Sequence, residues 1–190
     1  VERAGVNPGS IEDVVIGSVL TAGTAGMNVA RLSALAAGLP NSVSGQTIDR
    51  QCSSGLIAIA TAAKQIILDG QKVAVAGGQE NISAVQNAYL KWASDEQDSN
   101  VIAQSKHAYM PMLNTAEYVA QVYGISREAQ DEYAALSQKR TAYAQAAGAF
   151  DVEIAPITSI KRVINRETGE ETLEKVNLSK DEGNRPDTSI

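Results

Sequence analysis

The chain has 190 residues, of which 44% are hydrophobic and 20% are charged, so it has enough apolar material for a real core and does not resemble a disordered tail. Sixteen lysines and arginines stand against twenty-two aspartates and glutamates, which gives a formal net charge of −6. Because no dense basic cluster interrupts that balance, binding to nucleic acid or to an anionic membrane surface is disfavoured. No apolar run approaches the length of a bilayer span, so the sequence predicts a soluble chain.

A single cysteine and a single histidine limit the chemistry that the chain can hold by itself. One cysteine excludes a disulfide framework within the chain, and one cysteine with one histidine excludes a Cys/His zinc cluster. We therefore expect neither a metal nor a redox cofactor.

Both ends of the chain look cut. The first residue is Val1 and not methionine, and residues 1–5 (VERAG) are typical of the last turn of a helix that Gly5 ends. At the other end, Ile190 follows no terminating feature. We expect sequence to be missing on both sides, so the absence of a targeting peptide excludes little.

In chain order, the first half alternates strand and helix patterns. Apolar runs of strand length predict the strands, and apolar residues at helical spacing between a polar cap and a glycine predict the helices. The predicted elements are a strand at 14–19, a helix at 29–37 capped by Asn28, a strand from 47 towards Cys52, a helix at 53–69 and a fully buried strand at 73–76. Strand–helix–strand units of this kind predict a parallel or mixed sheet with right-handed crossovers.

The second half has a different pattern. Residues 83–112 show no clean period and are predicted to be long loops. Two helices are predicted at 115–123 and 126–147, each opened by a hydroxyl cap and closed by a glycine. Residues 159–176 predict two strands around a charged turn.

The most informative segment is residues 49–56 (DRQCSSGL), which places the one thiol where a strand passes into a helix. Unpaired backbone N–H groups and the positive end of the helix dipole favour a thiolate at that place. The same N–H groups can stabilise an oxyanion when the thiolate attacks a carbonyl carbon. Cys52 is therefore a candidate nucleophile, and its expected product is a covalent thioester.

The residue types around the thiol also allow a purely structural interpretation. A lone cysteine is most often a small buried hydrophobic residue, and a catalytic thiolate also needs a base. The one imidazole, His107, either lines a pocket or is an exposed loop residue. The glycines at 23 and 26 lack the lysine of a P-loop and the spacing of a dinucleotide fingerprint, so that segment is interpreted as an ordinary loop.

Two segments after the predicted buried strand also allow two interpretations. Residues 77–80 (GGQE) either bring the backbone close to an active site or form a tight turn. Tyr89 and Trp92 either contact an adenine or pantetheine group or form a local packing pair.

The chain resembles the thiolase family through an ordered set of motifs that spans nearly its whole length. Residues 52–56 (CSSGL) are similar to the nucleophile motif of that family. Residues 76–83 (AGGQENIS) are similar to its glycine turn, although the family usually has Ser-Met where this chain has Asn81 and Ile82. Further matching segments are 17–20 (GSVL), 30–31 (AR), 37–40 (AGLP), 115–117 (TAE), 119–120 (VA), 125–128 (ISRE), 130–131 (QD), 181–182 (DE) and 185–188 (RPDT).

The resemblance implies an α/β fold, the N-terminal half of a thiolase. We expect a mixed five-stranded sheet with covering helices, interrupted by a mainly helical loop domain that helps to hold coenzyme A. The expected domains are residues 1–83, the N-terminal core without its first strand, residues 84–155, the loop domain, and residues 156–190, an incomplete return to the core.

The resemblance also assigns roles to single residues. Cys52 would be the nucleophile that accepts an acyl group from a coenzyme A thioester, and Met112 would line the acyl pocket. The family usually has glycine where this chain has Leu113, which leaves the acyl-chain specificity open. A complete thiolase further uses a histidine that activates the nucleophile, a second cysteine as acid and base, and an asparagine–histidine pair that binds the thioester oxygen. In members of the family those residues lie in the C-terminal half of the protein, so these 190 residues alone are expected to be inactive in turnover.

The implied reaction joins two acetyl-CoA molecules into acetoacetyl-CoA and CoA, or runs as the reverse thiolysis. One alternative is a degradative 3-ketoacyl-CoA thiolase of fatty-acid β-oxidation that accepts longer chains. A second alternative is a non-catalytic, thiolase-like lipid-binding module. The expected assembly is a homodimer or homotetramer with coenzyme A thioesters as substrates, and the acidic composition suits a cytoplasmic bacterial enzyme.

Overall fold

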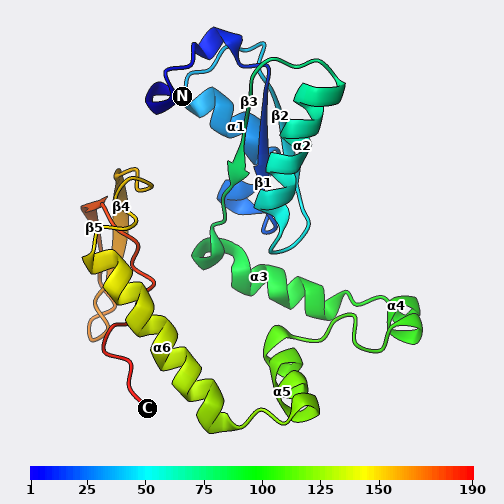
Figure 1. The fold of residues 1–190 in the computed structure, drawn as a ribbon, viewed down its shortest axis with the longest axis vertical. Coiled ribbons are helices and arrows are strands. Elements are labelled where there is room, and N and C mark those ends of the chain that lie inside the picture. The colour runs from blue at the N-terminus through cyan, green and yellow to red at the C-terminus, as the bar shows by residue number, and fades with distance from the viewer. The chain divides into compact units, whose positions relative to one another are not determined.

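The computed structural model describes residues 1–190, and the chain divides into two compact units, Val1–Tyr109 and Met110–Ile190. Figure 1 shows the elements of both units in chain order. Each unit is described by itself. The domain boundaries expected at residues 83 and 155 stay a prediction.

The first unit contains a parallel sheet of three strands, β1 (Asp13–Gly17), β2 (Ser44–Ile48) and β3 (Ala74–Gly78), in the order β2-β1-β3. The central strand β1 is nearly all buried. The predicted strand towards Cys52 ends earlier, at Ile48. The prediction that the third strand is fully buried was wrong, because β3 lies at an edge of this sheet and two of its five residues are exposed.

Two helices cover opposite faces of this sheet (Figure 1). Helix α1 (Val29–Ala36) packs through Ala30 and Ala34 in the cluster that holds Val14. Helix α2 (Ser54–Leu68) packs through Ala58 and Ala62 in the cluster that holds Val15. Since neighbouring residues of a strand point to opposite faces, Val14 and Val15 place the two helices on the two sides of β1.

The outer side of α2 is apolar and exposed. Leu56, Ile59 and Ile67 are 69%, 53% and 76% exposed. Residues Gln51–Leu68 are, by length and composition alone, apolar enough to cross a membrane, so the expectation that no run approaches that length was wrong. The alanines of the opposite side are packed on the sheet, as in the core helix of an α/β domain.

The segment predicted as long loops contains two helices, α3 (Ile82–Asp95) and α4 (Ser99–Gln104). Neither helix has a buried residue. The prediction of long loops was wrong for α3, in which Ile82, Val85, Tyr89 and Trp92 fall at helical spacing. Three short 3₁₀ turns, η1 (Glu2–Ala4), η2 (Pro8–Ser10) and η3 (Gly23–Ala25), complete the first unit.

The second unit contains helices α5 (Met112–Tyr123) and α6 (Arg127–Ala146) and strands β4 (Ile157–Ile164) and β5 (Glu171–Leu178). The predicted caps Ser126 and Gly124 are confirmed, since the Ser126 side chain accepts from the Ala129 N–H and Gly124 is left-handed. The predicted hydroxyl cap of α5 was wrong, because the helix starts earlier, after Pro111.

The strands of the two units form separate sheets. Strands β4 and β5 pair antiparallel along their full lengths and only with each other. The α/β class is confirmed, but the expected mixed five-stranded sheet is replaced by a three-stranded parallel sheet and a two-stranded hairpin.

Candidate active site

Cys52 lies in a tight turn between the end of β2 and the start of α2. The preceding residue, Gln51, has a φ of 49°, a left-handed conformation that is uncommon for residues other than glycine. The Asp49 carboxylate accepts the N–H of Gln51 at 2.9 Å and holds this turn. Cys52 is a free thiol and is exposed, so it is not the small buried hydrophobic residue that was the main alternative.

The hydroxyl of Ser54 ties the turn together from inside. The Arg50 N–H donates to Ser54 Oγ at 2.8 Å, and Ser54 Oγ donates to the Gln51 carbonyl at 2.6 Å. Ser54 is only 4% exposed. A buried hydroxyl with both of its bonds made fixes the backbone on each side of Cys52.

The backbone amides around Cys52 are partly used within the turn. The amides of Ser53 and Ser54 donate to the carbonyls of Arg50 and Gln51. The amides of Cys52, Gly55 and Leu56 have no intramolecular acceptor, and those of Gly55 and Leu56 belong to the open first turn of a helix. The sequence predicted free N–H groups around the thiol, and the structure limits them to these three amides.

Three glycines set the position of this turn against the sheet. A Cβ on Gly17, the last residue of β1, would lie 2.3 Å from the Ser54 carbonyl carbon and 2.4 Å from the Gly55 nitrogen. A Cβ on Gly78, at the end of β3, would lie 3.2 Å from the Gly55 Cα. The first turn of α2 therefore touches the backbone at the carboxyl ends of β1 and β3, which is where open parallel sheets place their ligands.

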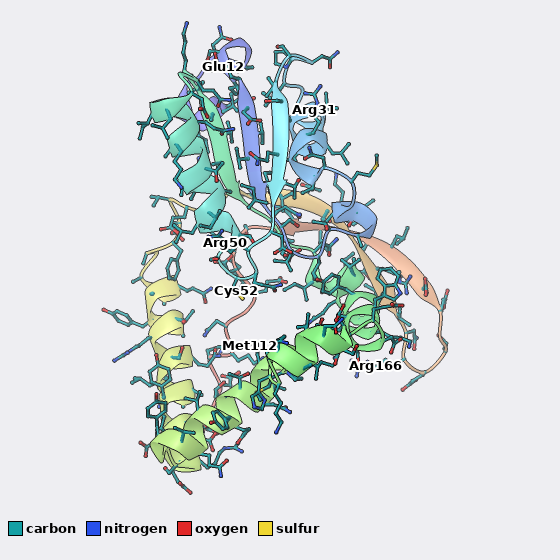
Figure 2. The ribbon with its side chains drawn as sticks, turned by 90° about the vertical axis from the view of Figure 1, so that its right-hand side faces the viewer. Glu12, Arg31, Arg50, Cys52, Met112 and Arg166 are labelled. Atoms are coloured by element: carbon teal, nitrogen blue, oxygen red, sulfur yellow. The ribbon has the colours of Figure 1, made fainter.

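Cys52 lines a cleft of about 600 Å³ at these strand ends. Figure 2 shows Cys52 beside Arg50, beyond the ends of the sheet strands. The cleft is lined by Gly17, Ser18, Val19, Leu20, Gln51, Cys52, Ser54, Gly55, Gly78, Gln79, Glu80, Ile82, Gln86, Tyr89 and Leu90. An exposed thiol beside an apolar cleft with glycine walls can receive an acyl group.

The loop after β3 contributes residues that the sequence interpretation left undecided. Of the segment 77–80, Gly78, Gln79 and Glu80 line the cleft, so the structure favours the interpretation in which this segment lies close to the candidate site. Tyr89 also lines it, whereas Trp92 does not. Glu80 was not assigned a role from the sequence, because its partners lie about sixty residues earlier in the chain.

The residues that line this cleft all belong to the first unit, and His107 is not among them. Met112 is the first residue of α5 in the second unit and is 77% exposed, so its role in an acyl pocket stays a prediction. His107 is an exposed turn residue after α4. The segment with glycines at 23 and 26 forms the 3₁₀ turn η3, in agreement with its interpretation as a loop.

Comparison with known proteins identifies the chain over its whole length. The sequence-family model described as the N-terminal domain of thiolase matches residues 1–190. An acetyl-CoA acetyltransferase of Cupriavidus necator is 43% identical over 82% of this chain and 42% of its own length. A 3-ketoacyl-CoA thiolase of Bacillus subtilis is 39% identical over 99% of this chain and 47% of its own length.

Other relatives extend the range of names. A peroxisomal 3-ketoacyl-CoA thiolase of Arabidopsis thaliana is 34% identical over all of this chain and 40% of its own length. The crystal structure of the Bacillus anthracis acetyl-CoA acetyltransferase superposes with a TM-score of 0.76 at 37% identity, covering all of this chain and 47% of that one. The chain thus spans somewhat less than half the length of these relatives, and it belongs to the thiolase family through that family's N-terminal domain.

Proposed function

We propose that the protein carrying this chain is an acetyl-CoA C-acetyltransferase that works through an acyl group on Cys52. It would join two acetyl-CoA molecules into acetoacetyl-CoA and CoA, or run the reverse thiolysis. The observation that supports this most is the exposed thiol of Cys52 in a cleft at the N-terminus of α2. The membership of the chain in a family of acyltransferases supports the same reaction class.

The first half-reaction is a transfer between two sulfur atoms. The Cys52 thiolate attacks the thioester carbon of acetyl-CoA, the bond from that carbon to the coenzyme A sulfur breaks, and coenzyme A leaves as a thiolate that takes up a proton. The tetrahedral intermediate carries an oxyanion. The free amides of Cys52, Gly55 and Leu56 are the donors that this chain offers near the thiol.

The second half-reaction forms the carbon–carbon bond. A base removes a proton from the methyl group of a second acetyl-CoA, the carbanion attacks the acetyl carbon on Cys52, and the Cys52 sulfur leaves as a thiolate. Glu80 is the one carboxylate that lines the cleft, and both of its oxygens already accept hydrogen bonds. We assign the base to the second cysteine of the family, which the resemblance places in the C-terminal half.

A degradative 3-ketoacyl-CoA thiolase is the second candidate. Relatives with that name match this chain at 39% and 34% identity, and Leu20, Ile82 and Leu90 give the cleft apolar walls for a longer chain. Thiolysis rates with acetoacetyl-CoA and with a long-chain 3-ketoacyl-CoA distinguish the two. An assembly of two or four copies stays a prediction. A cytoplasmic location also stays a prediction, since one relative is named as peroxisomal.

Replacement of the thiol in the full-length protein tests the proposal. Cys52→Ala is expected to lower thiolysis of acetoacetyl-CoA by about 10⁴-fold or more, because no nucleophile remains. The control is Ser53→Ala, which removes a neighbouring exposed hydroxyl that donates only to the Arg50 carbonyl, and it is expected to keep most of the activity. Normal thiolysis by Cys52→Ala would refute the role of Cys52.

A further inference from the structure

We infer that Glu80 is a positioning residue that holds one wall of the cleft and thereby sets how well the acyl group fits. The inference rests on the proposed function. The wall, here called the 18–20 wall, consists of Ser18, Val19 and Leu20, which follow β1 and line the cleft beside Cys52. Glu80 follows β3, the strand that pairs with β1.

The Glu80 carboxylate binds the backbone of the 18–20 wall with both oxygens. Oε2 accepts the N–H of Val19 at 2.8 Å, and Oε1 accepts the N–H of Leu20 at 3.0 Å. Oε1 is also 3.4 Å from the hydroxyl of Ser18, which donates to it. Hydrogen bonds from backbone amides to an ionised carboxylate are among the stronger ones in proteins.

No backbone carbonyl replaces Glu80 as the acceptor for these two amides. The carbonyls of Val19 and Leu20 instead accept from Thr21 and Ala22 in two narrow turns. The wall is thus not part of a helix or strand, and its conformation depends on a side chain from the neighbouring strand end.

Gln79 completes the connection at Ser18. Its Nε2 donates to Ser18 Oγ at 3.0 Å, and its backbone N–H donates to the Gly17 carbonyl at 3.0 Å. Ser18 itself is 1% exposed. The buried hydroxyl therefore accepts from Gln79 and donates to Glu80, so the base of the wall is fixed from both sides.

Glu12 offers a matched control at the other end of the same strands. Its Oε2 accepts the N–H of Lys72 at 2.7 Å, so it also joins the backbone before β1 to the backbone before β3. Glu12 does not line the cleft. Replacing either glutamate by glutamine keeps the volume and puts an N–H₂ group in the place of one acceptor oxygen.

The test compares Glu80→Gln with Glu12→Gln in the full-length protein, by thiolysis kinetics with a short and a long 3-ketoacyl-CoA. Loss of a charge-assisted bond in the wall is expected to raise the KM of Glu80→Gln about tenfold, with kcat little altered. It is also expected to change the ratio of the KM values for the short and the long substrate. Glu12→Gln is expected to leave both parameters unchanged. A kcat that falls about 100-fold at constant KM would instead make Glu80 an acid or base of the reaction and would overturn the inference. Equal effects of the two variants, or no effect of either, would also overturn it.

A second readout does not need turnover. The rates at which iodoacetamide and a long-chain N-alkyl maleimide modify Cys52 are measured by mass spectrometry of the Cys52 peptide. Glu80→Gln is expected to change the ratio of the two rates, while the rate with the small reagent stays near that of the unmodified protein. This ratio responds even if Cys52→Ala keeps its thiolysis, so failure of the proposed function and failure of the Glu80 inference are distinguishable.

Glu80→Asp covers the case in which Glu80→Gln does not fold. It keeps the charge but is one methylene shorter, so it cannot reach both amides. Glu80→Asp is expected to change the ratio of the two Cys52 modification rates in the same direction as Glu80→Gln, but by a smaller factor. A ratio equal to that of the unmodified protein in a folded Glu80→Asp would contradict the inference.

Discussion

Gly17→Ala tests how the sheet positions the first turn of α2. The new Cβ would lie 2.3 Å from the Ser54 carbonyl carbon, 2.4 Å from the Gly55 nitrogen and 2.5 Å from the Ser54 oxygen. All three atoms belong to the backbone, so no flexible side chain can move aside. Since ordinary contact begins near 3.4 Å, β1 and α2 must separate by about 1 Å.

That displacement predicts two effects. Overpacking of this kind costs about 1–3 kcal/mol in the free energy of unfolding. Cys52 precedes the displaced turn, and a shift of about 1 Å in a reacting group lowers a rate by on the order of 10²-fold. Gly17→Ala is therefore expected to lose far more activity than its stability alone would explain.

The assay combines chemical denaturation with thiolysis rates of the full-length protein under conditions where the variant is fully folded. Gly77→Ala is the control, because Gly77 lies in β3 next to Gly78 and its Cβ would meet nothing within 4 Å. A Gly17→Ala protein with the stability and rate of Gly77→Ala would refute the account of close contact between β1 and α2.

Two further predictions concern stability. Asp13 is 5% exposed, and its carboxylate accepts hydrogen bonds from the Val14 N–H, the Ser44 hydroxyl and Gln65 Nε2. Asp13→Ala is expected to lower the free energy of unfolding, measured with denaturant, by about 3 kcal/mol. Asp13→Asn is expected to lower the free energy of unfolding by less, because the Gln65 side-chain amide can flip so that its unpaired Oε1 accepts from the new amide. Equal losses for the two variants would contradict this prediction. At the start of α6, the backbone N–H of Glu128 and then the Ser126 hydroxyl lower the pKa of the Glu128 carboxyl. Because the pKa is lower in the folded state, the ionised Glu128 carboxylate stabilises the fold at pH values above its ordinary pKa of about 4.3, and this stabilisation is lost as the pH falls through the folded pKa. The difference in unfolding free energy between the unmodified chain and Glu128→Gln should therefore shrink as the pH falls over that window. A difference that stays constant would contradict this prediction.

The sequence predicted the elements whose signals are local. Asn28 caps α1 through its side chain, which accepts the Arg31 N–H, and Gly124 ends α5 in the left-handed conformation. The position of Cys52 between strand and helix followed from apolar spacing and was confirmed. Each of these signals acts within a few residues of the chain.

Most of the missed features depend on contacts between distant segments. Helix α3 is the exception, because Ile82, Val85, Tyr89 and Trp92 fall at helical spacing in the sequence, so this helix had a local signal that the prediction of long loops overlooked. The contact of Gly17 with Ser54 requires the packing of β1 against α2. The partners of Glu80 lie at the end of another strand, and only the sheet register brings Gly17 opposite Gly78.

The central claim is that the Cys52 sulfur accepts the acyl group, and mass spectrometry of the full-length protein quenched with acid during reaction with acetyl-CoA tests it most directly. The account predicts a peptide that contains Cys52 and is heavier by one acetyl group, with the acetyl group removed when free coenzyme A is added. Turnover with unmodified Cys52, or an acetyl intermediate on another residue, would contradict the account.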